Sequence, residues 1–327
     1  MRRAIILITL VVCVVLSAWG VSQATLPSAV DLLKKTYAAE SFGTHTGKLH
    51  TIVCTSNKSV AADVNIEQFG RHTRMEYTSG PSAGMVIIDN GDSVIRLVKP
   101  AKTAYISNVQ ASMANIDLLI KNYKPVLVGS GRIAGRDCRI VRVEPKCAGN
   151  PWRKLWIDKT SFVTLKTEEH NCEGKVSMMS EYSQVDYSSH PSSTLFTIPK
   201  GWKSVRIASK PESRCLEEAR KAVGFTPLKP RYVPAGYVYD GYSATCSMGG
   251  VKCAAGLRYT NGLIAISVFE CKCCDKDNGQ NCGQHDNRML GHNPNAHIVQ
   301  TRVGNINISI MGDVSERELQ RMAKSFK

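Results

Sequence analysis

The feature that most constrains the fold is a long series of short apolar segments separated by residues that favour turns. Six such segments lie between Gly47 and Asn108, and five more lie between Pro125 and Tyr187. Runs of this length, bounded by Gly, Pro, Asn or Ser, predict antiparallel strands joined by hairpins. The sequence Asp-Asn-Gly-Asp at Asp89–Asp92 is a strong hairpin turn of this kind. We therefore expect a meander of antiparallel strands over most of the first two hundred residues.

Two amphipathic segments accompany these strands. The first, residues 27–40, precedes them. Its apolar residues Val30, Leu33 and Tyr37 recur at helical spacing. Ser28 stands where a side chain can cap the first turn of a helix. The segment is predicted to form one amphipathic helix ahead of the sheet.

The second amphipathic segment is residues 110–124, which Pro125 is predicted to end because proline cannot continue a helix. The apolar stripe of this helix consists of Met113, Ile116, Leu119, Ile120 and Tyr123. Its first four residues are candidates for binding an apolar ligand. Packing of the stripe against the sheet is the simpler alternative.

A sheet of this length has to curl or be covered on its apolar face. A strongly curved sheet with only two helices has a hollow side, and such a hollow can hold an apolar ligand. Trp152 and Trp156 share one strand face with Lys154 and Asp158, which predicts the rim of the hollow. Trp156 is therefore added to the candidate ligand-binding residues.

The N-terminus has the three parts of a secretory signal peptide. Arg2 and Arg3 precede an apolar run from Ala4 to Trp19, and Ser-Gln-Ala at 22–24 fits a cleavage site. We expect cleavage after Ala24, so that residues 1–24 are removed. An uncleaved membrane anchor is the alternative, because the run is only slightly shorter than a membrane-spanning helix.

The chain is strongly basic, with a formal net charge of +15. In an exported protein the expected acidic partners are membrane surfaces, lipopolysaccharide-like lipids or acidic proteins. The basic residues are spread along the sequence and not gathered in one patch. No nucleic-acid partner is therefore predicted.

Composition changes divide the chain into two predicted domains. The first covers residues 25–204, and a polar segment at 205–214 is the predicted linker. The second covers 215–327, where a helix ended by Gly224 is followed by strands at 237–246, 253–260, 262–271 and 297–310. A last helix is expected at 314–326, with Asp313 or Ser315 as its cap.

The sequence has no motif for catalysis or for a cofactor. It contains no Gly-x-Ser-x-Gly, His-Glu-x-x-His, phosphate-binding loop or dinucleotide fingerprint. Its eight histidines are scattered, without a helical i, i+4 pair. We therefore expect a protein that is not an enzyme and carries no cofactor.

Twelve cysteines are the most unusual part of the composition, and all but Cys13 follow the predicted cleavage site. In an oxidising compartment they are expected to form disulfides, with at least one left over. Three pairs are predicted: Cys147–Cys172, which fall at the same end of the meander, Cys54–Cys138 as the second pair of the first domain, and Cys246–Cys253 across a hairpin loop.

The remaining cysteines form a cluster with three interpretations. It consists of Cys271, Cys273, Cys274 and Cys282, with Cys215 on the preceding helix. Disulfides that staple a loop, drawn from Cys271, Cys274 and Cys282, are the favoured interpretation. A metal site that adds His285 is weaker, because the spacing lacks two Cys-x-x-Cys turns. A redox pair at Cys271 and Cys274 would not stand at a helix start, where a thiolate is stabilised.

Longer motifs in both domains resemble the RseB/MucB-type family of sigma-E regulatory proteins. In the second domain these are Pro234–Tyr237 ("PAGY"), Tyr259–Phe269 ("YTNGLIAISVF") and Val303–Ser325, which begins "VGNINISIMGDV". In the first domain, "GRIAGRDCRIVRVEP", "RKLWIDKTSFVTLKTE" and "STLFTIPKGWK" fit the strands and the last segment of the family's large domain. The cysteine cluster between Cys271 and Cys282 departs from the family pattern.

The resemblance implies an α+β protein with a LolA-like unclosed antiparallel β-barrel, covering helices and a smaller α+β domain. It further implies a periplasmic, non-enzymatic envelope-stress regulator. Such a protein would bind the periplasmic region of a transmembrane anti-sigma factor, shield it from proteolysis, and release it when acyl chains of lipid or lipoprotein bind. A lipid or lipoprotein carrier of LolA type is one alternative, and a metal- or redox-responsive protein is another. The sequence leaves a homo-oligomer open.

Overall fold

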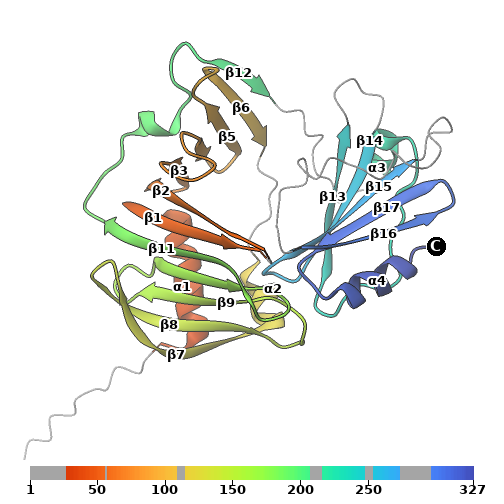
Figure 1. The fold of residues 1–327 in the computed structure, drawn as a ribbon, viewed down its shortest axis with the longest axis horizontal. Helices are drawn as coiled ribbons and strands as arrows, with labels where there is room; N and C mark the ends of the chain where they lie inside the picture. The colour runs from red at the N-terminus through yellow and green to blue at the C-terminus, as the bar shows by residue number, and fades with distance from the viewer. Residues whose placement is uncertain (1–26, 56, 109–114, 207–215, 247–252, 273–295) are drawn as a thin grey trace, which may run out of the picture.

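The strands of the protein form two separate sheets, one of twelve strands and one of five (Figure 1). The computed structural model describes residues 27–55, 57–108, 115–206, 216–246, 253–272 and 296–327. The predicted signal peptide lies outside these residues. The predicted fold class, an unclosed barrel-like sheet with covering helices and a smaller α+β domain, is confirmed. Of the helices that the structure describes, none has the length and apolar character needed to cross a membrane.

The larger sheet consists of two meanders joined side by side. Its strands are β1 (Thr44–Cys54), β2 (Ser59–Phe69), β3 (His72–Tyr77), β4 (Val86–Asp89), β5 (Ser93–Val98), β6 (Thr103–Asn108), β7 (Tyr123–Ile133), β8 (Arg136–Pro145), β9 (Trp152–Asp158), β10 (Thr164–His170), β11 (Val176–Asp186) and β12 (Lys203–Arg206). Their spatial order is β12-β6-β5-β4-β3-β2-β1-β11-β10-β9-β8-β7. The pairing of β1 with β11 joins the two meanders, and β7 and β12 remain as edges, so the sheet does not close.

One strand departs from the antiparallel meander. The short 3₁₀ helix η1 (Ser193–Phe196) precedes β12, which pairs in parallel with β6. Val205 and Arg206, in the predicted linker, therefore belong to a strand of the larger sheet. The rest of that linker lies outside the described residues.

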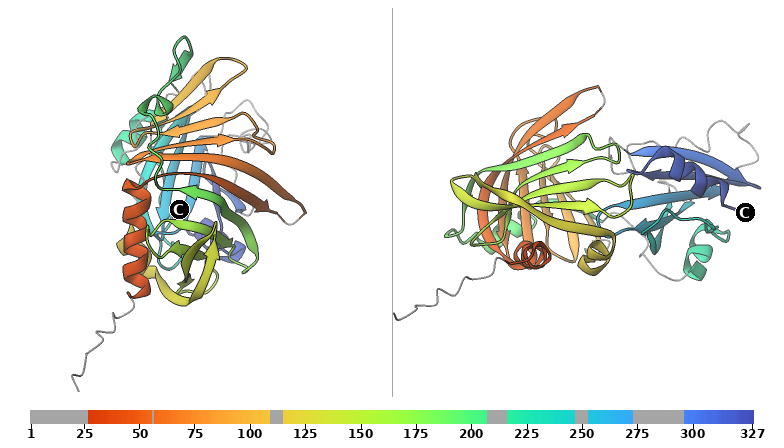
Figure 2. Two further views of the ribbon diagram at one scale, coloured as in Figure 1. Left: turned by 90° about the vertical axis from the view of Figure 1, so that its left-hand side faces the viewer. Right: turned by 90° about the horizontal axis from the view of Figure 1, so that it is seen from below.

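The first helix, α1 (Ala29–Phe42), lies against the larger sheet on the same side as α2 (Ile116–Asn122) (Figure 2). Ser28 caps it as predicted, because its Oγ accepts a hydrogen bond of 3.1 Å from the Asp31 backbone N–H. The buried face of α1 consists of Leu32, Leu33 and Thr36. Of the predicted stripe only Leu33 is fully buried, since the helix is rotated toward Leu32 and Thr36.

The second helix is shorter than predicted, because the chain changes to β-structure earlier. It ends at Asn122, and β7 begins at Tyr123, so Pro125 lies inside a strand and does not end the helix. A proline is tolerated there because β7 is an edge strand of the sheet. Pairing of β7 with β8 along the whole length of both strands outweighs the helical spacing of Tyr123.

Strand β9 separates two apolar clusters on its opposite faces. Leu155 and Ile157 pack with Leu32, Leu33 and other residues under the helices. Trp156, which points the other way because strand side chains alternate, belongs to a second cluster. The alternation of β9 therefore decides which side chains can meet the helices.

A buried histidine contacts the second cluster through Tyr182. His45 on β1 is 2% exposed, and its Nε2 lies 3.0 Å from the Tyr182 hydroxyl. Its Nδ1 has no hydrogen-bond partner among the described residues. Burial lowers the pKa of His45 to about 4, so the imidazole is neutral in the folded protein at neutral pH.

Acidification should weaken this cluster through His45. The unfolded chain takes up a proton near the ordinary pKa of 6.5 and the folded chain only near 4, so stability falls as pH decreases through that window. The expected loss between pH 7 and 4.5 is about 2 to 3 kcal/mol. Hydrogen exchange of β1 peptides at both pH values measures it. His45→Gln should remove this loss, whereas the exposed His190→Gln should retain it; equal slopes in both variants would contradict the assignment.

The smaller sheet has its own apolar core. It comprises β13 (Val238–Cys246), β14 (Cys253–Thr260), β15 (Ala265–Lys272), β16 (His297–Val303) and β17 (Ile306–Gly312), flanked by α3 (Leu216–Val223) and α4 (Glu316–Lys324). The predicted strand at 297–310 is two strands, because Gly304 has a left-handed backbone (φ +57°) that turns the chain between β16 and β17. Ser315 occupies the N-cap position of α4, but its side chain makes no capping hydrogen bond. The carboxylate of Asp313 accepts a hydrogen bond from the Cys172 backbone N–H instead.

A carboxyl group is buried on the apolar face of β15. Glu270 is fully buried, on the same strand face as Ile266 and Val268. Its Oε2 accepts a 2.8 Å bond from the Leu228 backbone N–H, and its Oε1 has no partner among the described residues. Desolvation raises the pKa of Glu270 to about 7.

Removing this charge should stabilise the smaller domain at alkaline pH. Because the folded pKa of Glu270 lies above its ordinary value of 4.5, its contribution to stability is present at acid pH and is lost as pH rises through about 7. Glu270→Gln should therefore slow hydrogen exchange of β14 and β15 at pH 8, by about 2 to 3 kcal/mol more than at pH 5. The exposed Glu217→Gln serves as the control. An equal effect of Glu270→Gln at both pH values would argue against a buried carboxylate.

Candidate functional site

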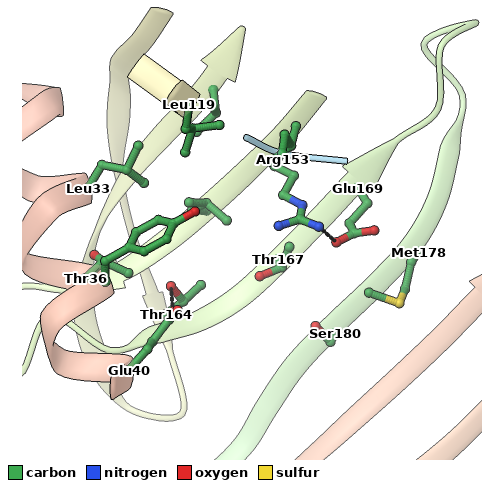
Figure 3. A pocket seen from close by; sticks show the side chains of 14 residues that line it. Leu33, Thr36, Glu40, Leu119, Arg153, Thr164, Thr167, Glu169, Met178 and Ser180 are labelled. Atoms are coloured by element: carbon green, nitrogen blue, oxygen red, sulfur yellow. Dashed lines mark hydrogen bonds and ion pairs between the residues drawn. The ribbon is translucent and has the colours of Figure 1, made fainter. Parts of the chain in front are cut away.

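A cavity of about 170 Å³ lies between α1, α2 and the strands β8 to β11 (Figure 3). The side chains that line it are Leu33, Thr36, Tyr37, Glu40, Leu119, Val143, Arg153, Leu155, Thr164, Thr167, Glu169, Met178, Ser180 and Leu263. Thirteen of these come from the first domain, and Leu263 comes from the second. The cavity is therefore enclosed by both domains.

Polar groups occupy one side of this cavity. Arg153 Nη2 and Glu169 Oε1 form an ion pair at 2.8 Å, across the paired strands β9 and β10 (Figure 3). Thr164 donates a 2.6 Å hydrogen bond from its Oγ1 to Glu40 Oε1. Although Glu40 is exposed as a residue, desolvation of its carboxyl group raises its pKa. These groups can meet the polar end of a ligand.

The hydroxyl of Thr36 is the unsatisfied group of the cavity wall. The residue is 2% exposed, and its Oγ1 has no hydrogen-bond partner among the described residues. A buried hydroxyl without a partner is unfavourable, because it has lost its hydrogen bonds to water. Thr36 is therefore available to bond an oxygen or nitrogen atom of a ligand.

Apolar side chains form the other walls of the cavity. Leu33 comes from α1, Leu119 from α2, and Val143 and Leu155 from the sheet. Leu263 lies on the turn between β14 and β15 and packs against the cluster under the helices. The arrangement of apolar walls with a few polar groups is typical of a site for an amphiphile.

The turn that carries Leu263 is fixed to α2 by buried polar contacts. Asn122 Nδ2 donates to the backbone oxygens of Gly236 and Asn261, at 2.8 and 2.9 Å. Asn261 Nδ2 in turn donates to the Tyr123 hydroxyl at 2.9 Å, while its Oδ1 accepts from two backbone N–H groups of its own turn. These contacts set the position of the second domain relative to the cavity.

The fit of this turn against α2 leaves no room for a side chain at Gly262. A Cβ atom built at Gly262 would lie 2.4 Å from the backbone nitrogen of Leu119. Gly262 also has a φ of +94°, a conformation that L-amino acids with side chains rarely adopt. Glycine is therefore required both by the turn and by its close approach to the helix.

A second contact between the domains involves Asp313. Its Oδ1 accepts a 3.1 Å hydrogen bond from the backbone N–H of Cys172, in the loop between β10 and β11. Burial raises the pKa of Asp313, and burial followed by the nearby Asp313 charge raises the pKa of the Cys172 thiol to about 12. The thiol is thus protonated and unreactive in this position.

The predicted groove residues do not form one group. Leu119 lines the cavity, and Ile116 packs against the same apolar cluster. Ile120 is half-buried and does not line the cavity, while Met113 lies outside the described residues. Trp156 is on the opposite face of β9, in the cluster with His45's partner Tyr182.

Trp156 does not form a rim as expected. It is largely buried, and the ammonium groups of Lys154 and Lys166 lie 4.7 and 5.0 Å from its ring centroid. Contacts of this geometry stabilise a cation above an aromatic face. The alternation of β9 agrees with the sequence pattern, which left open the face that the helices cover.

Two predicted disulfides of the first domain are wrong. Cys147 and Cys172 lie at the same end of the sheet, as expected, but they are separate thiols. Cys54 and Cys138 are too far apart for a disulfide. The registers of four successive strand pairs place Val53, the neighbour of Cys54, level with Val143 on β8, which is five residues from Cys138. Five residues along β8 already amount to about 17 Å, whereas a disulfide needs Cα atoms within about 7 Å.

The cysteines of the second domain are only partly within the described residues. Cys246 and Cys253 are directly opposite each other in the register of β13 and β14, as the hairpin prediction requires. Cys271 lies in β15 opposite Ala254. Cys215, Cys273, Cys274, Cys282 and His285 fall outside. Within the described ranges no three His, Cys, Asp or Glu residues are grouped to hold a metal, and the cluster interpretations remain predictions.

Most residues of the cavity and of the docked turn could not be predicted from the sequence. Arg153, Glu169 and Thr164 occur in strands as ordinary polar residues, and only the register brings them to one side of the cavity. Asn261 and Gly262 had a local signal, since Asn-Gly marks a turn. Nothing local indicated that this turn contacts α2.

One family model matches most of the first domain. Residues 65–198, from within β2 to just after η1, match the family described as the MucB/RseB N-terminal domain. The chain is similar to this family over that segment. The resemblance to the RseB/MucB-type family that the sequence motifs predicted is thereby confirmed. No curated protein matches the sequence significantly.

Solved structures extend the likeness beyond the MucB/RseB N-terminal domain to the second domain. A chain of the complex structure of Pseudomonas aeruginosa MucA/MucB has a TM-score of 0.62 at 17% identity, covering 91% of this chain and 98% of that chain. The crystal structure of MucB in complex with MucA(peri) gives 0.61 at 15% identity, with the same coverage. A crystal structure of MucB gives 0.55 at 16% identity, covering 91% and 97%. The two-domain fold is thus shared.

The register of β13 and β14 predicts a disulfide between Cys246 and Cys253. Residues directly opposite in an antiparallel pair have Cα atoms about 4.5 to 5.5 Å apart, which suits a disulfide. Peptide mapping of non-reduced protein should find the two residues linked. In Cys246→Ser the thiol of Cys253 should react with iodoacetamide without reduction. Labelling of both residues in the unreduced wild type would contradict the bond.

Proposed function

We infer that the protein is an exported, non-enzymatic regulator of the envelope stress response in the periplasm. It would bind the periplasmic region of a transmembrane anti-sigma factor and release it when the acyl chain of a lipid or lipoprotein enters the cavity. The observation that carries this proposal is the match to the MucB/RseB N-terminal domain within a two-domain fold like that of MucB. Two of the similar MucB chains come from structures that also contain MucA.

The cavity supports the ligand part of the proposal. Its apolar walls at Leu33, Leu119 and Leu155 suit hydrocarbon, and Thr36 and Arg153 offer polar contacts to a head group. The basic charge of the chain favours acidic partners at a membrane surface. The predicted signal peptide supports a location outside the cytoplasm.

A lipid or lipoprotein carrier is the second candidate function, favoured by the helix-covered cavity alone. At about 170 Å³ this cavity is below the range of about 300 to 1,000 Å³ that is usual for ligand pockets. A carrier has to enclose its cargo during transfer, whereas a sensor needs only enough binding to shift an equilibrium. The size of the cavity therefore favours the regulator.

Binding to an anti-sigma factor should be direct and sensitive to an acyl ligand. Crosslinking of the full-length protein in its own envelope should recover a single-pass membrane protein whose cytoplasmic segment binds a sigma factor. Calorimetry with the purified periplasmic segment of that protein should then give saturable binding. Addition of lysophosphatidylcholine should release the segment. Failure of the segment to bind at low salt would overturn the regulator proposal.

A pair of variants tests whether the release acts through the cavity. Ser180 lines the cavity on β11, while Ser183 on the same strand is exposed and does not line the cavity. Ser180→Phe should fill the cavity and lower the effect of lysophosphatidylcholine at least tenfold, without loss of segment binding. Ser183→Phe should behave as the wild type. Equal release from both variants would place the lipid site elsewhere.

A further inference from the structure

We propose that the turn Asn261–Leu263 is the wall of the cavity that moves when an acyl chain enters, so that filling of the cavity and docking of the second domain exclude each other. The inference rests on the proposed function, in which an acyl chain enters this cavity. It adds the route by which that ligand would change the relation of the two domains. The surface that both domains form together would then change with the lipid.

The size of the cavity requires one wall to move. A volume of about 170 Å³ is close to that of an engineered protein cavity of ~150 Å³ that accepts one benzene molecule. The acyl chains of membrane lipids are several times longer than a benzene ring. Only a short part of such a chain fits the cavity as it stands.

The sheet and the first helix are held more firmly than the turn. The strands β9, β10 and β11 each have a hydrogen-bonded neighbour on both sides. In α1, Leu32 and Leu33 are fully buried. The carbonyl of Glu40 accepts a hydrogen bond from the Gln68 side chain. Just after the helix, the carbonyl of Gly43 accepts a hydrogen bond of 3.0 Å from the Gly70 N–H. Displacing either element would break several contacts within one domain.

The turn belongs to a different domain and is held mainly by side-chain hydrogen bonds. Asn122 and Asn261 supply them, and Leu263 adds one apolar contact to the cavity wall. Interfaces of this polar kind between domains commonly allow relative motion. The polar groups would regain bonds to water after separation, so the turn is the wall that moves most easily.

Leu119 connects the cavity directly to this turn. Its side chain lines the cavity, and its backbone nitrogen faces Gly262 with no space for even one additional carbon atom. Because packed groups without intervening space cannot approach further, a ligand that pushes Leu119 outward must also push the turn. The coupling is therefore mechanical and local.

Linkage makes the coupling reciprocal, which provides the test. If the acyl chain opposes docking, a substitution that opposes docking must increase affinity for the chain. Gly262→Ala adds a Cβ that meets the Leu119 backbone, yet Gly262 does not line the cavity. Gly304→Ala is the matched control, since Gly304 also has a positive φ (+57°) in a turn of the same domain but has nothing within 4 Å of an added Cβ.

The experiment measures binding of 11-(dansylamino)undecanoic acid by fluorescence, and domain separation by small-angle X-ray scattering. Gly262→Ala should bind this probe about 5 to 150 times more tightly than the wild type, and Gly304→Ala should not differ from it. Saturation of the wild type with the probe should increase its radius of gyration toward that of the ligand-free Gly262→Ala protein. Asn122→Ala, which removes two docking bonds, should give the same direction if Gly262→Ala does not fold.

Two different results would overturn the proposal. Equal affinity of all variants, with no change in scattering on saturation, would remove the coupling and leave the proposed lipid site intact. Failure of the probe to bind any of the proteins would remove the acyl-chain ligand itself, and the coupling with it. The two failures are therefore distinguishable.

Discussion

The relative position of the two domains depends on a small set of polar side chains. Their burial is tolerated because each of them makes hydrogen bonds within the protein. Asn261 is 2% exposed and satisfies the Tyr123 hydroxyl with its nitrogen while its oxygen holds its own turn. An amide without these partners would be unfavourable by about 1 to 3 kcal/mol. Because these bonds are directional, they select one docked position, whereas apolar contacts alone would tolerate many. The cavity, which needs Leu263 to complete its wall, exists in this form only in that position.

The larger sheet provides the rigid half of this arrangement. Consecutive hairpins build each of its meanders, and the long-range pairing of β1 with β11 joins them. This pairing closes the chain over a long loop, so the sheet is not fixed until the second meander has formed. Helix α1 then packs its Leu32 and Leu33 against apolar residues of β8 and β9, which belong to the second meander.

The sequence was sufficient for the strands, the turns and the family, because those signals are local. Asn-Gly turns and alternating apolar residues each act within a few residues. It was insufficient where a position depends on a distant strand. The stripe of residues 110–124 fitted a helix, but pairing of Tyr123–Ile133 with β8 converted its end into a strand. Trp156 and the pair Cys54–Cys138 were misplaced because neither the covered face nor the β1–β11 pairing has a local signature.

Burial disfavours the charged form of a base in the first domain, His45, and of an acid in the second, Glu270. His45 resists protonation and Glu270 resists ionisation, so acid weakens the first domain while it strengthens the second. Between about pH 4.5 and 6.5 the two contributions have similar size and opposite sign. The total stability of the chain then changes little with pH in this range, while the balance of stability between the two domains shifts. Acid favours the smaller domain, and alkali favours the first domain, which supplies most of the cavity wall.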